Sequence, residues 1–211
     1  MEEKFQILKV NLKHFAFPHI LLCLVLAGIS PMFMGTENLN PSKTARVLEM
    51  FVALLGIIML TPVCLPEQND EIKELVETKY ISYTKVIIMR IIENLLCLMI
   101  MTGLYIVMLR YNNCSFPVFK YYLGTLAEAF FFGEMGFCAF VLFNQIAVGY
   151  LLPLMYYIIA VGSGKKLLGN FYPFSMTIGS YQEKIYLAVV GLILLFSGIS
   201  YLNLSKRLRV G

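Results

Sequence analysis

Charged residues are scarce in this sequence. Asp, Glu, Lys and Arg make up 14% of the chain, 59% of the residues are hydrophobic, and the mean hydropathy is +0.74. Soluble domains carry about 25% charged residues, so this composition excludes a water-soluble globular protein. Polar stretches run to about twenty residues at most, which leaves no room for a nucleotide-binding domain. We therefore expect an integral membrane protein that has no ATP-binding domain of its own.

Clusters of cysteine or histidine are also missing. The five cysteines have no close spacing, and an odd number without a paired motif argues against a disulfide framework or a metal site. His14 and His19 do not share a helix face well, which argues against a histidine metal site. We expect no metal and no cofactor in this chain, and cysteines that act as small reduced hydrophobic side chains.

The residue arrangements of intramembrane enzymes are missing too. We find no serine–histidine or two-histidine arrangement placed within apolar stretches, no paired cysteines and no intramembrane pair of aspartates. No basic face of useful size is present, so nucleic-acid binding is not expected. An intramembrane enzyme is therefore a less favoured interpretation of this protein.

Long hydrophobic runs are what the sequence does contain. A membrane span needs about 20 mostly apolar residues, and six such runs can be identified. They are residues 15–34, 47–65, 86–109, 121–143, 146–162 and 185–204. The first run has no small-residue cleavage site before Gly35, so we expect a retained span and no cleaved signal peptide. The predicted fold class is all-α, with residues 1–211 forming one transmembrane domain.

Lysine and arginine indicate how the spans are oriented, because these residues accumulate in cytoplasmic loops. A cytoplasmic N-terminus places the larger group on the inner side: Lys4, Lys9, Lys13, Lys73, Lys79, Lys85, Arg90, Lys206, Arg207 and Arg209. The smaller group is then outside: Lys43, Arg46, Arg110, Lys120, Lys165, Lys166 and Lys184. We expect both termini in the cytoplasm, which an even number of spans allows, and a multi-pass protein of a bacterial cell membrane.

The connector between the second and third runs, Glu67–Lys85, is the most informative polar stretch. Asn69 is a suitable N-cap, and acidic residues follow it in the first turn, where the helix dipole favours them. Apolar residues recur at helical spacing on one face: Ile72, Leu75, Val76, Tyr80 and Tyr83. This pattern predicts an amphipathic helix over residues 69–80 that lies at the cytoplasmic surface.

Charged residues within the apolar runs need an explanation, and four of them are Glu128, Glu134, Arg90 and Glu93. A charge at midspan costs on the order of 3 kcal/mol, so Glu128 and Glu134 should face protein or water. Two interpretations are open for each: a polar wall of a translocation path that receives a cationic group, or pairing across helices or simple protonation. Arg90 and Glu93 share a helix face near the inner end of the third run and can form a local pair.

Three shorter features carry expectations about packing. Asn40-Pro41-Ser42 predicts a turn within an outer loop over residues 35–46. The aromatic outer segment 163–183 is apolar enough to dip into the membrane. Ala129 and Gly133 lie one helical turn apart, which favours close helix approach, either at a dimer face or, more commonly, within one chain.

This layout resembles the type-two ABC exporter permeases. The resemblance is carried by Pro66–Asn94, PEQNDEIKELVETKYISYTKVIIMRIIEN, in which an acidic connector and Lys79-Tyr80-Ile81-Ser82 lead to a third span containing Arg90. FYPFS at 171–175 resembles the proline-containing stretch before the last span of that family. The resemblance covers nearly the whole chain as layout, although exact shared motifs are few and a large outer domain is lacking.

The resemblance implies a permease subunit without catalytic residues. It would dock a separate ABC ATPase, which carries ATP and Mg²⁺, and pair with a second permease chain in a homodimer or heterodimer surrounded by membrane lipid. The implied ATPase contacts are Glu67, Glu71, Glu74 and Tyr80, and the path candidates are Glu134, Glu128, Arg90 and Glu93. The cargo would be a peptide, an antibiotic or another amphipathic molecule, with antimicrobial peptide export or immunity as the specific expectation. Without the resemblance, the connector would be interpreted as a membrane anchor, and a non-transporting assembly factor or sensor stays an alternative.

Overall fold

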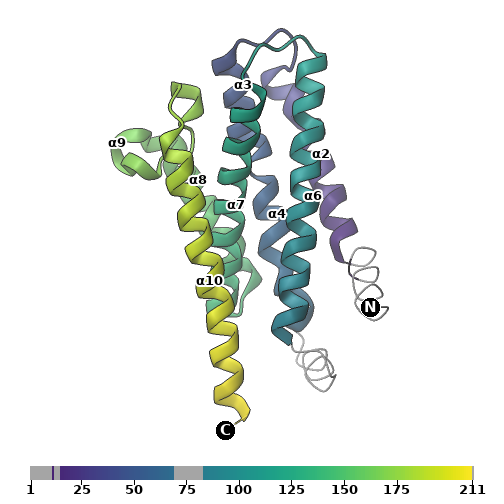
Figure 1. Ribbon diagram of the computed structural model, residues 1–211, viewed down its shortest axis with the longest axis vertical. Coiled ribbons are helices and arrows are strands. Elements are labelled where there is room, and N and C mark those ends of the chain that lie inside the picture. Colours follow the sequence, from purple (N-terminus) through teal and green to yellow (C-terminus); the bar gives the residue numbers. More distant parts are fainter. Residues whose placement is uncertain (1–10, 12–14, 69–82, 211) are drawn as a thin grey trace.

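The computed structural model describes residue 11, residues 15–68 and residues 83–210, and every regular element in this part is helical (Figure 1). The first and third spans are α2 (Phe17–Met34) and α6 (Tyr83–Tyr111). The second span is composite: α3 (Pro41–Val47), the π-helix η2 (Leu48–Val52), α4 (Leu55–Leu60) and the 3₁₀-helix η3 (Thr61–Gln68). The remaining long helices are α7 (Val118–Phe143), α8 (Ile146–Ser163) and α10 (Gln182–Val210).

Six helical stretches are long and apolar enough to cross a membrane, in agreement with the hydrophobic runs of the sequence. They are Phe17–Met34, Pro41–Pro66, Thr84–Tyr111, Val118–Phe143, Ile146–Ser163 and Gln182–Leu204. The prediction of an all-α protein with six helices able to span a membrane is thus confirmed for the described residues.

The start of the second span was predicted wrongly. Asn40-Pro41-Ser42 does not form a turn within a loop but begins α3. The Oδ1 atom of Asn40 accepts a hydrogen bond from the backbone N–H of Lys43 at 2.9 Å, which caps the helix, and Pro41 occupies the first helical position. Proline suits this position because the missing N–H has no partner in the first turn of a helix. The span therefore begins six residues earlier than its apolar run.

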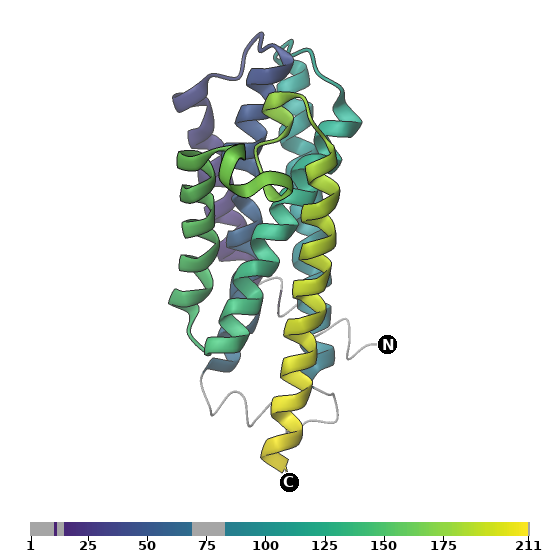
Figure 2. The same ribbon diagram turned by 90° about the vertical axis from the view of Figure 1, so that its left-hand side faces the viewer.

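The second span and α7 form the centre of the bundle. In their most apolar windows 78% and 72% of the residues are buried, against 11% in α2, 17% in α8 and 22% in α10. Figure 2 shows α8 and α10 on opposite sides of α7, and Figure 1 shows α2 at the outside of the bundle next to α6. The sparsely buried helices present leucine, isoleucine and phenylalanine to the exterior, as lipid-facing helices do.

The two ends of the bundle differ. We call the end of the bundle at which α10 finishes the terminal end (Figure 1). Because successive spans alternate in direction, α2 also starts toward the terminal end. At the opposite end, two loops bind each other: the N–H of Asn38 donates to the carbonyl of Asn112 at 2.9 Å, and the N–H of Ser115 to that of Leu39 at 3.3 Å. The segment before α10, with α9 (Lys165–Leu168), η4 (Gly169–Phe171) and η5 (Met176–Ile178), also lies toward this opposite end.

Candidate functional site

The central crossing of α4 and α7 depends on small residues. A Cβ atom added to Gly56 would lie 1.8 Å from the carbonyl oxygen of Ala129, and one added to Gly133 would lie 2.6 Å from the carbonyl oxygen of Gly56. The backbones of the two helices therefore touch directly, which only glycine and alanine allow. Ala129 and Gly133 serve packing within the chain, which was the more common of their two explanations.

A buried charge cluster of Glu49, Glu128 and Lys184 joins three spans near this crossing. The Nζ atom of Lys184 lies 2.8 Å from Oε1 of Glu49 and also contacts Oε2 of Glu128. The two carboxylate side chains have no exposed surface, and that of Lys184 is 5% exposed. Pairing across helices is thus observed for Glu128, and the favourable ion pairing offsets the cost of removing three charges from water.

Glu49 also binds the backbone of the segment that precedes α10. Its carboxylate accepts hydrogen bonds from the N–H of Met176 at 2.7 Å, the N–H of Thr177 at 3.0 Å and the hydroxyl of Thr177 at 2.7 Å. Three donors in addition to the ammonium group of Lys184 thus contact this one carboxylate. Glu49 lies in the π-helix η2, an irregular turn of the kind that often occurs at functional sites in helices.

The segment between α8 and α10 is drawn into the bundle by these contacts. Pro173, Phe174, Ser175 and Met176 are buried, and the carbonyl of Pro173 accepts a hydrogen bond from Lys184. Farther along, the hydroxyl of Tyr156 in α8 donates to the carbonyl of Phe171 at 2.7 Å. This outer segment packs between helices, and its depth in a membrane stays a prediction.

Tyr172 adds a neutral group beside the charge cluster. Its pKa is raised above the ordinary tyrosine value, mainly by burial and further by the nearby carboxylates of Glu49 and Glu128. The phenol therefore stays protonated at neutral pH and can act as a hydrogen-bond donor.

Glu134 has a different environment from Glu128, although both lie on α7. Its side chain is fully buried, and neither carboxylate oxygen has a hydrogen-bond partner among the described residues. Asn94 of α6 is 1% exposed, and its Nδ2 atom donates to the carbonyl of Met59 at 2.8 Å. Its Oδ1 atom has no hydrogen-bond partner among the described residues. Buried acceptors without donors are costly, so these two residues are candidates for a binding site.

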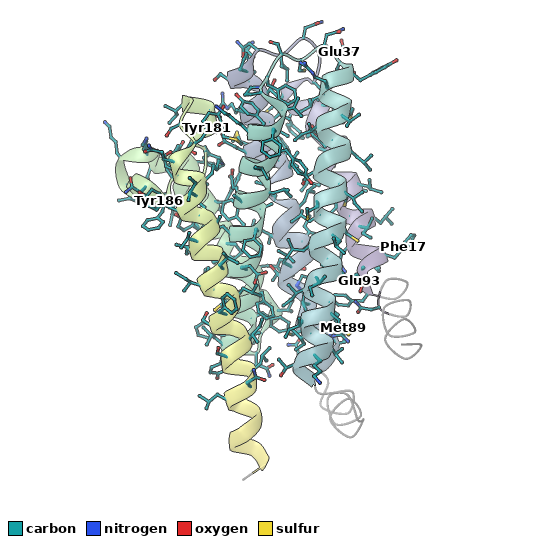
Figure 3. All side chains as sticks on the ribbon, in the orientation of Figure 1. Phe17, Glu37, Met89, Glu93, Tyr181 and Tyr186 are labelled. Carbon is teal, nitrogen blue, oxygen red and sulfur yellow. The ribbon has the colours of Figure 1, made fainter. Side chains whose placement is uncertain are left out.

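Arg90 and Glu93 lie on α6 toward the terminal end, where Glu93 is labelled in Figure 3. The guanidinium of Arg90 donates to the carbonyl of Val63 at 3.2 Å and lies 5.7 Å from the ring centre of Phe15. Oε2 of Glu93 accepts a hydrogen bond from Asn11 at 2.6 Å. These contacts join α6 to η3 and to the chain before α2, and a role of either residue in a translocation path stays a prediction.

The residues expected to contact an ATPase fall largely outside the described part of the chain. Glu71, Glu74 and Tyr80, together with the predicted helix 69–80, lie between Gln68 and Tyr83, the last and first described residues on either side. Glu67 belongs to η3 by its backbone, and its side chain is outside the description. The docking role of all four residues stays a prediction.

Two members of the charge cluster, Lys184 and Glu49, were not among the residues predicted from the sequence. Lys184 was assigned to an outer loop, whereas it lies in the first turn of α10 and is buried. Glu49 was passed over because it stands near the start of an apolar run. A lone acid in a predicted span is a signal in itself, because such residues usually have a buried partner.

Comparison with family models, with curated proteins and with solved structures finds no match for this chain. The function is therefore proposed from the residues and the geometry described above.

Proposed function

We propose that this chain is the membrane-spanning subunit of an ABC exporter of a bacterial cell membrane, and that a separate ATPase drives it. The observation that carries the proposal is where the two elements that flank the acidic connector lie. Its flanking elements, η3 and α6, both meet it at the terminal end of a six-helix bundle, the end at which α10 also finishes. In the permeases that this chain resembles, the ATPase docks on the connector between the second and third spans.

The composite second span supports a mechanism for the coupling. A force on the connector at residues 69–82 acts on η3 and α4, which are continuous with η2 and α3. Glu49 in η2 binds the outer segment at Met176 and Thr177, and its partner Lys184 lies at the start of α10. Movement of the second span would thus be transmitted to the opposite end of the bundle through one carboxylate. Such coupling requires two discrete arrangements of the permease pair, which ATP binding and hydrolysis bias.

The remaining parts of the proposal follow from this role. A second permease chain, identical or different, would complete the path, and the cargo would be a peptide, an antibiotic or another amphipathic molecule, as in antimicrobial peptide export or immunity. Glu134, Glu128, Arg90 and Glu93 are the proposed polar residues of the path, and Glu67, Glu71, Glu74 and Tyr80 the proposed ATPase contacts. ATP and Mg²⁺ would bind to the ATPase and not to this chain.

The test is reconstitution of the full chain in lipid with ABC ATPases from the same genome, beginning with any that is encoded beside it. We expect stimulated ATP hydrolysis and a stable complex, both lost in a Glu71→Lys, Glu74→Lys double variant. Glu37→Lys is the matched control, because Glu37 is exposed at the opposite end of the bundle (Figure 3). A complex that keeps normal hydrolysis after the double charge reversal would refute docking at the connector. If the wild-type chain neither binds nor stimulates an ATPase, the chain is better explained as an assembly factor or a sensor.

A further inference from the structure

Position 134 of α7 lies on a face that α10 covers. Gly191 of α10 packs against the ring of Phe130 and the backbone of Phe131, and Gly198 packs against the ring of Phe137. Position 134 follows position 130 by one turn on the same face of α7, so it lies between these two contacts. The two glycines bring α10 close to α7 and cover the carboxylate, in agreement with its complete burial.

Asn94 lies at the same level of the bundle as Glu134. The amide of Asn94 binds the carbonyl of Met59, and the next residue, Leu60, packs its side chain against Gly133. Met59 accepts from one of the two N–H donors of the Asn94 Nδ2 group, and the acceptor Oδ1 has no partner among the described residues. This level of the bundle thus holds three buried acceptor atoms, Oδ1 of Asn94 and both carboxylate oxygens of Glu134, and none has a donor among the described residues.

We propose that Glu134 and Asn94 form a binding site for a primary ammonium group carried by an amphipathic molecule. An ammonium group has three N–H donors and no acceptor, which matches three acceptor atoms, and its charge compensates the carboxylate. The aromatic rings of Phe130 and Phe137, which precede and follow position 134 on α7, suit the apolar part of such a molecule. The site is closed in this arrangement and becomes accessible when α10 moves away from α7.

This proposal deepens the proposed function, on which it rests for the statement that the bound molecule is the cargo. Within that role, it narrows the cargo to amphipathic molecules with a free amine. Glu128 does not offer the same site, because one of its oxygens is already bound by Lys184. The ammonium of Lys184 at Glu128 instead shows the kind of contact that an external amine would make with Glu134.

The experiment measures binding directly, without an ATPase. The full chain in lipid nanodiscs is titrated with 1,5-diaminopentane that carries a dansyl group on one nitrogen, so that the other amine is free and charged at neutral pH. The control probe is the same molecule with this amine acetylated. Empty nanodiscs are titrated to subtract partitioning of both probes into lipid. We expect the amine to bind at least about tenfold more tightly than the acetylated probe, because a buried charged hydrogen bond is lost on acetylation. Glu134→Gln should reduce the affinity for the amine to that for the acetylated probe, and Asn94→Leu should weaken it in the same direction.

Glu37→Gln is the matched control, since it makes the same chemical change at an exposed position, and it should leave the affinity for the amine unchanged. Equal affinities of the wild-type chain for the two probes would overturn the proposal, and so would unchanged amine binding by a folded Glu134→Gln variant. Loss of amine selectivity with intact ATPase stimulation refutes this inference alone. Selective amine binding by a chain that stimulates no ATPase refutes the proposed function and leaves the site in place.

Discussion

The ammonium nitrogen of Lys184 lies 2.8 Å from Oε1 of Glu49, which joins the first turn of the last span to the π-helical turn of the second span. Glu49 simultaneously holds the backbone of Met176 and Thr177. The outer segment, the second span and α10 are therefore connected through a single buried carboxylate. This relationship gives the proposed movement of the second span a direct route to the opposite end of the bundle.

Replacing Lys184 by methionine should destabilise the protein strongly. The change leaves Glu49 and Glu128 buried without their shared counter-charge, and breaking a buried pair in this way costs about 3–5 kcal/mol. Thermal unfolding in detergent measures the effect. Lys166→Met is the control, because Lys166 is exposed and should tolerate the change. A Lys184→Met, Glu128→Gln double variant should lose less stability than the sum of the two single changes, and strict additivity would argue against the ion pair.

Replacing Glu49 by glutamine should loosen the outer segment without removing the helix. A neutral amide retains one acceptor oxygen in place of two, so the backbone N–H groups of Met176 and Thr177 cannot both be satisfied as before. Hydrogen exchange of the peptide that contains these residues should become about tenfold faster or more. The same peptide should exchange at the wild-type rate in Glu37→Gln. Unchanged protection in Glu49→Gln would show that packing of Met176 alone holds the segment.

The crossing of α4 and α7 should not tolerate any side chain at Gly56. The Cβ atom of alanine would overlap the carbonyl of Ala129, so Gly56→Ala should destabilise the chain by about 1–3 kcal/mol or more. Gly28→Ala makes the same substitution in α2, where a Cβ atom meets nothing within 4 Å. The comparison of their unfolding midpoints checks the prediction, which fails if the two variants are equally stable.

Asn40 should contribute to stability as the cap of α3. Removing its side chain in Asn40→Ala leaves the N–H of Lys43 without its acceptor, at an expected cost of about 1 kcal/mol. Asn170→Ala is an appropriate comparison, because Asn170 is an exposed residue of η4. Equal unfolding midpoints for these two variants would mean that solvent replaces the cap.

Much of the fold could be predicted because the length of an apolar run is a local property of the sequence. Each of the six apolar runs became a helical span, since only a helix satisfies its own backbone within a bilayer. The start of the second span was missed because Asn-Pro-Ser is typical both of turns and of helix starts, and only the hydrogen bond from Lys43 to Asn40 distinguishes them. Glu128 and Glu134 were recognised as unusual from the sequence, but nothing local showed that Glu128 pairs with Lys184 while Glu134 has no partner among the residues that the structure describes.

By itself, the sequence determined the six apolar stretches that became helices and the location of the acidic connector between the second and third of them. The tertiary structure decided which charges meet. Lys184 was expected in a loop and lies buried between Glu49 and Glu128, whereas Glu134 has no donor within the described part of the chain. The physical reason is that a span depends on about twenty consecutive residues, whereas an ion pair depends on the packing of helices far apart in the chain. That packing rests here on the small residues at which α4 and α10 approach α7.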